Sequence, residues 1–259
     1  MRLQLISDLH LETESYEPHP APGAELLVLA GDVDSTWRGL SLFRDWPVPV
    51  LFVPGNHEYD GRDVDSARAG LHALARELGF VMLDDASLVI NDGEGRRVRF
   101  IGSTRWSDFD LFGTAQRERA MRAAGYFQRV MAATRDGRPF GAAAVRDEGL
   151  RCRDWLARQL ELGEQGQDWD ATVVITHFAP SIQSADPRYG RQPGTASFCN
   201  DDEALLSGAR LWLHGHLHCR HDYRLHGCRV LCNARGHGRK GEADGYDGQR
   251  LIDVFDTPA

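Results

Sequence analysis

Chemically active side chains gather in five short runs along the sequence. The runs are Asp8-Leu9-His10, Gly31-Asp32, Gly55-Asn56-His57-Glu58, His177 and Gly215-His216-Leu217-His218. Two carboxylates, one amide oxygen and several imidazoles suit a divalent transition metal such as Mn, Fe or Zn. The seven candidate ligands in these runs exceed what one ion takes. They suit two ions about 3.5–4 Å apart that share a carboxylate, as in two-metal hydrolases.

Each run taken alone has an ordinary structural explanation. An aspartate that follows a strand can cap a turn or a helix, and a lone histidine such as His177 is often a buried core residue. The Gly-His-x-His run is more specific, because alternate residues of an extended segment point the same way. The five runs together, in this order, favour a metal site over unrelated structural roles.

A metal site of this kind needs strands that bring their ends to one edge of a sheet. Apolar runs of strand length, bounded by turn residues, predict strands at residues 3–6, 26–30, 50–53, 87–90, 98–102, 172–176, 211–214, 229–232 and 251–255. Amphipathic stretches predict helices at 63–78, 114–133 and 145–161. This alternation predicts an α/β fold, in which ligands sit beyond the carboxyl ends of strands. No break in composition divides the chain, so we expect residues 1–259 to form a single domain.

The composition is that of a globular protein and argues against several other classes. The chain has 259 residues, of which 42% are hydrophobic and 26% charged, which excludes disordered and coiled-coil proteins. The five cysteines are odd in number and lack Cys-x-x-Cys spacing, as expected for reduced thiols in a cytoplasmic protein. No apolar run reaches signal-peptide or membrane-span length, so we expect no membrane partner. Nothing in the sequence indicates an oligomeric state.

The five runs closely resemble the motifs of the calcineurin-like metallophosphoesterase superfamily, and they extend from Asp8 to His218. Residues 102–109 also resemble a segment of bacterial members without an assigned substrate. The resemblance implies a four-layer α/β-β/α fold with a central β-sandwich and a binuclear metal centre. By motif match it implies one metal held by Asp8, His10, Asp32 and His218, and a second held by Asp32, Asn56, His177 and His216. Asp32 would bridge the two metals, and His57 would face the substrate without binding metal.

One position departs from the family pattern. Many members read Gly-Asp-x-x-Asp, and the second aspartate supports the catalytic histidine. The chain has Ser35 at that position. Asp34, one residue earlier, and Asp60, after the histidine motif, are alternative partners for His57.

Several other residues are weaker candidates for the site. Substrate binding is predicted for Arg188, Tyr189, Arg191 and Arg235, which follow predicted strands. His214 could be an accessory ligand, although a packed role is favoured, and Trp106 and Phe109 could stack on a base or pack in the core. Basic residues between 117 and 138 could grip phosphate, but a solvated helix face is favoured. His221, His226 and His237 are expected on the surface or in loops, and the glycine-rich segment 236–248 is expected to be a mobile surface loop.

The predicted function is therefore hydrolysis of a small phosphorylated substrate, with phosphodiesters or nucleotides favoured. A hydroxide that bridges two divalent ions (Mn, Fe, Zn or Ni) would attack phosphorus, and His57 would stabilise the transition state or protonate the leaving oxygen. One alternative is a non-catalytic scaffold, which should leave gaps in the ligand set. Another is a nuclease, which should need an electropositive groove. A net charge of −8 disfavours a nucleic-acid partner.

Overall fold

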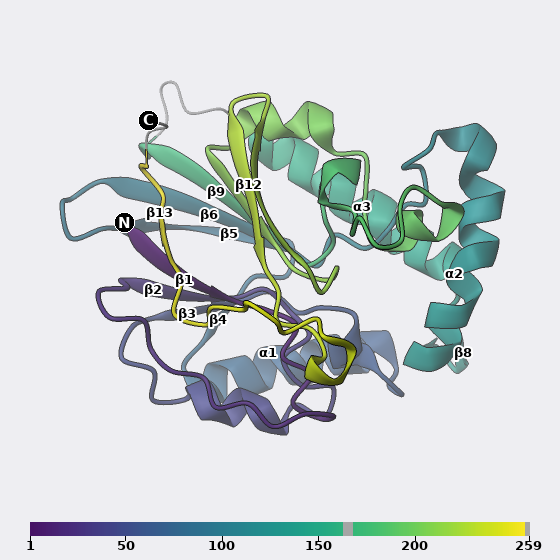
Figure 1. The fold of residues 1–259 in the computed structure, drawn as a ribbon, viewed down its shortest axis with the longest axis horizontal. Coiled ribbons are helices and arrows are strands. Elements are labelled where there is room, and N and C mark those ends of the chain that lie inside the picture. Colours follow the sequence, from purple (N-terminus) through teal and green to yellow (C-terminus); the bar gives the residue numbers. More distant parts are fainter. Residues whose placement is uncertain (163–167, 257–259) are drawn as a thin grey trace.

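Two β-sheets lie at the centre of the fold, with helices outside them (Figure 1). The computed structural model describes residues 1–162 and 168–256. The first sheet has the strand order β13-β1-β2-β3-β4. Its strands are β1 (Arg2–Ile6), β2 (Leu26–Leu29), β3 (Val50–Phe52), β4 (Val81–Met82) and β13 (Leu251–Asp253). Strands β1 to β4 run parallel, and β13 is antiparallel to β1.

The second sheet has the strand order β11-β12-β10-β9-β6-β5. Its strands are β5 (Ala86–Asn91), β6 (Arg97–Ser103), β9 (Ala171–Thr176), β10 (Leu211–His214), β11 (Arg220–Leu225) and β12 (Cys228–Asn233). The central four strands are parallel, and β5 and β11 are antiparallel edges. Nearly every residue of β9 and β10 is buried, as expected for parallel strands covered on both faces.

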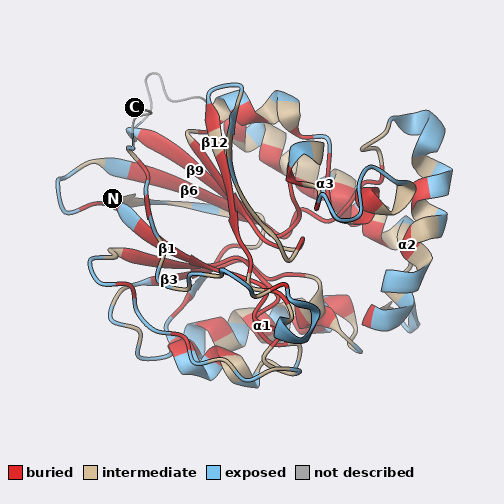
Figure 2. Cartoon of the chain, in the orientation of Figure 1, coloured by how far each residue is buried: buried red, intermediate tan, exposed pale blue. Residues whose placement is uncertain are grey.

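Three apolar clusters divide the structure into layers. Leu5 and Val28 of the first sheet meet Phe100 and Val173 of the second in the cluster between the sheets. The outer face of the first sheet packs against α1 (Val64–Leu78), and that of the second packs against α3 (Ala142–Leu160). Figure 2 shows buried residues along both sheets and exposed residues on the outer faces of the helices. The predicted four-layer α/β-β/α fold is therefore confirmed.

The helix α2 (Arg117–Met131) stands to one side, beyond the ends of the central strands (Figure 1). A short hairpin, β7 (Thr134–Arg135) and β8 (Arg138–Pro139), follows it. The three predicted helices are present, and α1 begins where Asp63 accepts a hydrogen bond from the Ser66 amide. Among the described residues, no helix is both long and apolar enough to cross a membrane.

All nine predicted strands have a counterpart, but the sequence analysis missed four short or polar strands, β4, β7, β8 and β11. Strand β11 pairs with β12 through a two-residue turn in which His226 and Gly227 both have positive φ. Such turns match the twist of a hairpin. Charged residues alternate along β11, so it carries no apolar run that would have predicted a strand. All five cysteines are free, as predicted.

Candidate metal centre

The predicted ligands come together because both sheets present the carboxyl ends of their parallel strands to the same place. From the first sheet, β1 leads into Asp8 and His10, β2 into Asp32 and β3 into Asn56. From the second sheet, β9 leads into His177, and β10 leads into His216 and His218. Three overlapping groups of ligand atoms result, Asp8–His10–Asp32, Asp32–His177–His216 and His10–His218–His237. Asp32 and His10 each belong to two of these groups, and of the two only Asp32 has two oxygens with which it could bridge two ions.

An unusual backbone conformation turns these side chains inward. The left-handed region is occupied at five of the seven predicted ligands, with φ of 49–74° at Asp8, His10, Asp32, His216 and His218. Backbone of this kind is costly and clusters at functional sites. Gly215 lets the turn after β10 approach Asp8, since a Cβ there would lie 2.6 Å from Asp8 Oδ2. The His216 amide donates to both Asp8 oxygens at 2.9 and 3.0 Å.

Two imidazoles face each other in the first half of the site. His10 Nε2 lies 2.9 Å from His218 Nε2, and His218 Nε2 lies 3.6 Å from Asp8 Oδ1. The other nitrogen of each ring meets a carboxylate, with His10 Nδ1 3.1 Å from Glu12 and His218 Nδ1 2.8 Å from Glu242. A carboxylate only accepts, so each neutral ring carries its proton on Nδ1. Both Nε2 lone pairs therefore point at one place.

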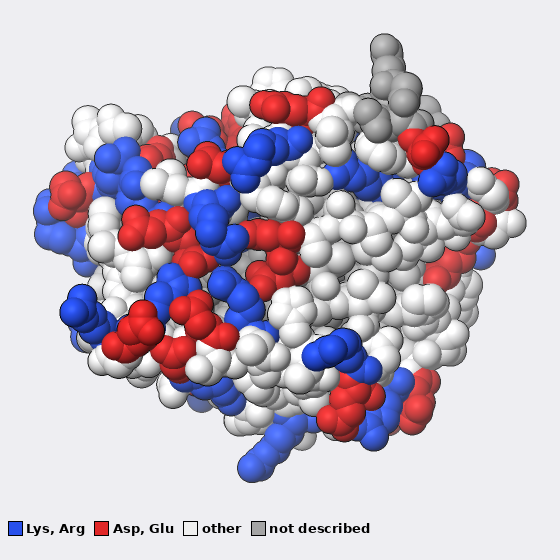
Figure 3. Space-filling model, turned by 180° about the vertical axis from the view of Figure 1, so that it is seen from behind, with Lys and Arg blue, Asp and Glu red and all other residues white. Residues whose placement is uncertain are grey.

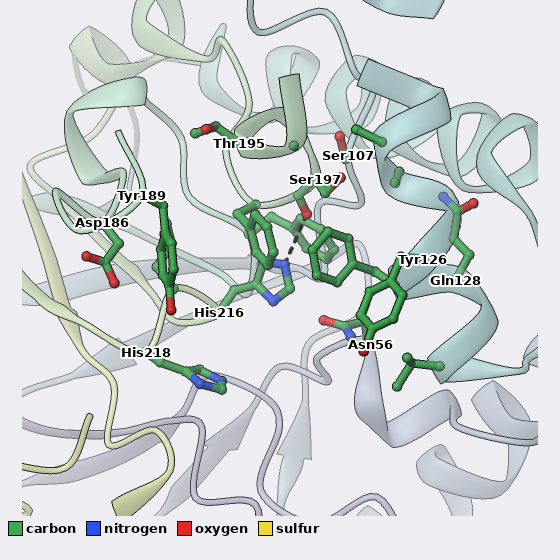
Figure 4. A pocket seen from close by; sticks show the side chains of 18 of the residues that line it. Asn56, Ser107, Tyr126, Gln128, Asp186, Tyr189, Thr195, Ser197, His216 and His218 are labelled. Atoms are coloured by element: carbon green, nitrogen blue, oxygen red, sulfur yellow. Dashed lines mark hydrogen bonds between the residues drawn. The ribbon is translucent and has the colours of Figure 1, made fainter. Parts of the chain in front are cut away.

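The second half of the site repeats this arrangement. His177 Nε2 lies 3.1 Å from Asp32 Oδ2, 3.2 Å from Asn56 Oδ1 and 3.1 Å from His216 Nδ1. In each ring, the nitrogen that points away from the site again lies next to a hydrogen-bond acceptor. His177 Nδ1 lies 2.8 Å from the Ala30 carbonyl. His216 Nε2 faces the Ser197 carbonyl at 3.1 Å (Figure 4, dashed line). These contacts fix the tautomers so that lone pairs converge on a second place.

The spacing of the converging nitrogen and oxygen atoms matches the spacing of ligands around a metal cation. Metal–nitrogen bonds of about 2.0–2.1 Å put ligands of one ion roughly 3.0–3.4 Å apart, close to the spacings within each half of the site. Asp32 Oδ2 is buried, and within the described part of the chain only His177 Nε2, 3.1 Å away, faces it; that nitrogen offers a lone pair and no proton when the neutral ring carries its proton on Nδ1. A buried carboxylate oxygen without a donor is costly unless a cation meets it. The donor set therefore fits divalent metal ions.

The titration behaviour of the site reflects this need for positive charge. Burial raises the pKa of Asp32, but the charges of His177 and His57 outweigh burial and hold it well below the usual range. Burial lowers the pKa of His177, but the Asp32 carboxylate raises it to about 9. Without a cation, a proton on His177 offsets the charge of Asp32. A metal ion can replace that proton, since ligand imidazoles bind metals in their neutral form.

His57 lies beside the ligands and not among them. Its amide donates to Asp32 Oδ1 at 2.9 Å, and its Nδ1 lies 2.7 Å from Asp60 Oδ2. Of the two alternative partners for His57, Asp60 is therefore the one that contacts its ring. Asp34 instead accepts hydrogen bonds from the Thr36 and Gly39 amides within its own turn. Burial lowers the pKa of His57, but the Asp32 and Asp60 carboxylates raise it to about 10. A cation at Asp32 would remove part of that increase.

The sequence analysis missed four residues that support the site. Glu12 and Glu242 orient His10 and His218, and Glu58 accepts from the amides of Asp32, Val33 and Gly55. Glu58 belongs to a recognised motif, and burial raises its pKa to about 7. His237 lies in a loop, as the sequence analysis allowed, but it is half-buried beside the site, and its ring centroid lies 4.6 Å from that of His10. Segment 236–248 likewise contributes the buried Glu242 to the site, so it is not simply a surface loop.

The weaker candidates lie in different places. Tyr189 lines the cavity over the site, and Arg188 pairs with Asp186 at 2.6 Å. Arg191 is exposed outside the cavity lining, and Arg235 pairs with Glu14 at 3.0 Å.

The other residues with two predicted roles are packed or exposed. His214 is buried against Ser184, and burial lowers its pKa to about 3. Trp106 and Phe109 are each 2% exposed and belong to the core around α1. Of the arginines between 117 and 138, Arg119 lines the cavity, and Arg117 pairs with Asp110 at 2.6 Å.

Comparisons with known proteins agree with this geometry. Among solved structures, phosphopantetheinyl hydrolase (PptH) from Mycobacterium tuberculosis matches with a TM-score of 0.72 at 20% identity, covering 99% of this chain and 98% of that chain. A protein assigned as a 5′-nucleotidase from Staphylococcus aureus matches with a TM-score of 0.52 at 13% identity, covering 91% of this chain and 49% of that chain. At these identities the likeness shows the fold alone. No curated protein matches the chain in sequence.

The sequence profile of the calcineurin-like phosphoesterases matches residues 1–220, which include all five runs of candidate ligands. The chain therefore belongs to the calcineurin-like phosphoesterase family and is a phosphoester hydrolase.

Proposed function

We propose that the chain hydrolyses small phosphoesters, with phosphodiesters and nucleotides favoured, at a centre of two divalent metal ions. The observation that carries this proposal is the convergence of four imidazole lone pairs, two on each side of Asp32. Asp8, His10, Asp32 and His218 would hold one ion, and Asp32, Asn56, His177 and His216 the other. Nitrogen and oxygen donors without thiolates suit Mn, Fe, Zn or Ni.

Two bound ions would supply a deprotonated water at neutral pH and offset charge on the phosphoryl oxygens. The chain itself positions that chemistry. The carboxylates of Glu12 and Glu242 hold the rings of His10 and His218 in the orientation that a ligand needs. Glu58 connects the turns after β2 and β3, because its carboxylate accepts hydrogen bonds from three backbone amides of these turns. These bonds hold Asp32 rigidly.

His57 is the proposed acid or hydrogen-bond donor. It lines the cavity, and Asp60 holds its Nδ1, which leaves Nε2 as the ring nitrogen that can reach a substrate. From that position it can donate to a phosphoryl oxygen or to the leaving oxygen. Asp60 would act through His57 by keeping the ring oriented. It would take the role of the second aspartate of the family motif, a position that Ser35 occupies in this chain.

The two alternatives receive less support. A scaffold should lack ligands, but all seven positions are filled and their ligand atoms lie close together. A nuclease should need a continuous positive surface, and the face seen in Figure 3 offers none, since its Lys and Arg are interspersed with Asp and Glu beside a large uncharged area. Free cysteines fit a reducing compartment, so we propose the cytoplasm as its location.

A reconstitution panel tests the proposal. Metal-free protein would be loaded with Mn, Fe, Zn or Ni and assayed on phosphomonoesters, phosphodiesters, cyclic nucleotides and nucleotide pyrophosphates. A phosphopantetheinyl ester belongs in the panel because of the hydrolase of similar fold. We expect loss of activity with EDTA, recovery with a divalent ion, and two ions per chain. Full activity without metal, or no hydrolysis by protein that holds two ions, would refute it.

A further inference from the structure

Helix α2 exposes large apolar side chains toward the candidate metal centre. Tyr126 is 63% exposed, Phe127 41% and Val130 54%. All three line one cavity of about 800 Å³ together with Asn56, His57 and His216. Contiguous apolar surface on a soluble protein marks a binding site far more often than isolated apolar residues do. We call Tyr126, Phe127, Val130 and the neighbouring Phe198 the apolar bay.

The apolar bay is continuous with the metal centre. The ring centroid of Phe127 lies 4.9 Å from that of Phe198, and Phe198 lies 4.9 Å from the ring of His216. One aromatic ring therefore separates α2 from a candidate ligand. In Figure 4, Tyr126 and Gln128 lie on one side of His216, and Tyr189 and Asp186 lie on the other. A molecule with its phosphoryl group at the ligands would extend into the bay.

Charge and size define what the bay accepts. Among the cavity-lining residues of α2, Arg119 alone is charged. It is 7 residues from Tyr126 and 11 residues from Val130, or about 10 and 16 Å along a helix that rises about 1.5 Å per residue. The other Asp, Glu, Lys and Arg residues that line the cavity come from other elements, namely Asp32, Asp186, Lys240 and Glu242. Pockets of about 300–1,000 Å³ hold drug-sized ligands, so a phosphoryl group alone fills a small part of this one.

We propose that the substrate is a phosphoester with a bulky, uncharged apolar group, an aryl ring or an aliphatic chain, which occupies the apolar bay. Tyr126, Phe127, Val130 and Phe198 are then the residues that set specificity. This inference rests on the proposed function, since the phosphoryl group of the same molecule must sit at the metal centre. Small polar phosphoesters would occupy only the end of the cavity next to the predicted metal ligands, and water would fill the apolar bay.

Calorimetric titration of metal-loaded protein with methyl-, butyl- and hexylphosphonate tests the proposal without relying on turnover. Phosphonates resist hydrolysis and share one headgroup, so differences in Kd report on the chain alone. We expect Kd to fall by up to about fourfold for each methylene that becomes buried. A Kd that does not change with chain length would overturn the proposal.

Substitutions in the apolar bay test whether the dependence of Kd on chain length arises there. The double variant Phe127→Ser with Val130→Ser should flatten the dependence on chain length and leave the Kd of methylphosphonate unchanged. Both positions are more than one-third exposed, and an unchanged Tm verifies the fold. Leu42→Ser, at a residue 52% exposed outside the cavity, is the control and should keep the wild-type dependence.

The remaining outcomes separate the two proposals. If the double variant keeps the wild-type dependence, the bay does not hold the chain and the inference fails. If sedimentation shows a dimer that the double variant abolishes while the dependence persists, the α2 face is an interface between copies and the inference again fails. Failure of the proposed function would instead show as absent phosphoester hydrolysis, whatever the phosphonate affinities are.

Discussion

Removing the carboxylate of Glu242 should weaken metal binding at His218, although Glu242 is no predicted ligand. Its Oε2 accepts from His218 Nδ1 at 2.8 Å and from the His237 amide at 2.9 Å. The residue is 6% exposed, so water cannot readily replace it. Glu242→Ala would leave the His218 ring free to rotate or to change tautomer, and either change turns the lone pair away from the site.

The size of the effect follows from the kind of hydrogen bond that is lost. A hydrogen bond to a charged group contributes about 1.5–3 kcal/mol. At about 1.4 kcal/mol for each factor of ten, Glu242→Ala should raise one metal Kd by roughly 10–100-fold, the range typical for residues that orient ligands. Glu242→Gln keeps an acceptor without the charge, so its effect should be smaller.

Competition with a chelator of known affinity would measure the Kd of each ion in the two variants. Asp244→Ala is the matched control, since it removes an exposed carboxylate from the same segment. A thermal melt of each protein shows whether the fold survives. If Glu242→Ala binds both ions as tightly as the wild type, Glu242 does not orient His218 and the reasoning is refuted.

Three further predictions test other parts of the site. Asp60→Asn should retain both ions but lower kcat by about 10–100-fold on alkyl phosphoesters, with a smaller loss on nitrophenyl esters, because His57 loses its orienting partner; equal losses on both substrates would argue against that role. Gly215→Ala should reduce the metal content measured by elemental analysis, because the added methyl group would displace Asp8; full occupancy would contradict this. Arg105 is fully buried and pairs with Asp108 and Asp202, each at 2.8 Å. Arg105→Met should therefore lower the free energy of unfolding in urea by about 3–5 kcal/mol, because it leaves these two buried carboxylates unpaired; a change below 1 kcal/mol would show that the ion pairs contribute little.

Much of the fold could be predicted because apolar runs and turn residues sit next to each other in the sequence. The runs before Asp8, Asp32 and His177 are largely buried strands, and the predicted ligands follow the ends of these strands. Strand β11 could not be predicted in the same way, because it is an edge strand whose charged side chains face water. Its pairing depends on the turn at Gly227 and on β12.

The supporting residues of the site were harder to predict, because their roles depend on contacts between distant segments. His237 and Glu242 lie in a glycine-rich segment without periodicity, and they reach the centre because the chain after β12 runs alongside the residues that follow β1, where the amides of Arg235 and Gly236 donate to the carbonyls of Ser7 and Asp8. Arg235 lies next to this segment in the sequence and was a predicted substrate-binding residue, but its side chain forms an ion pair with Glu14. Asp60 could be proposed from its spacing to His57, whereas choosing it over Asp34 required the hydrogen bonds of both.

If the proposed ions bind, the division of the predicted ligands between the two sheets would link metal supply to the lifetime of the protein. Asp8, Asp32 and Asn56 belong to one sheet and His177 and His216 to the other, so bound ions would fasten the halves of the sandwich together. An ion present at 100 times its Kd stabilises the native state by about 2.7 kcal/mol. Losing one such ion would raise the unfolded population about 100-fold and expose it to proteases. In a cell short of metal, the idle enzyme would therefore be degraded as well as inactive.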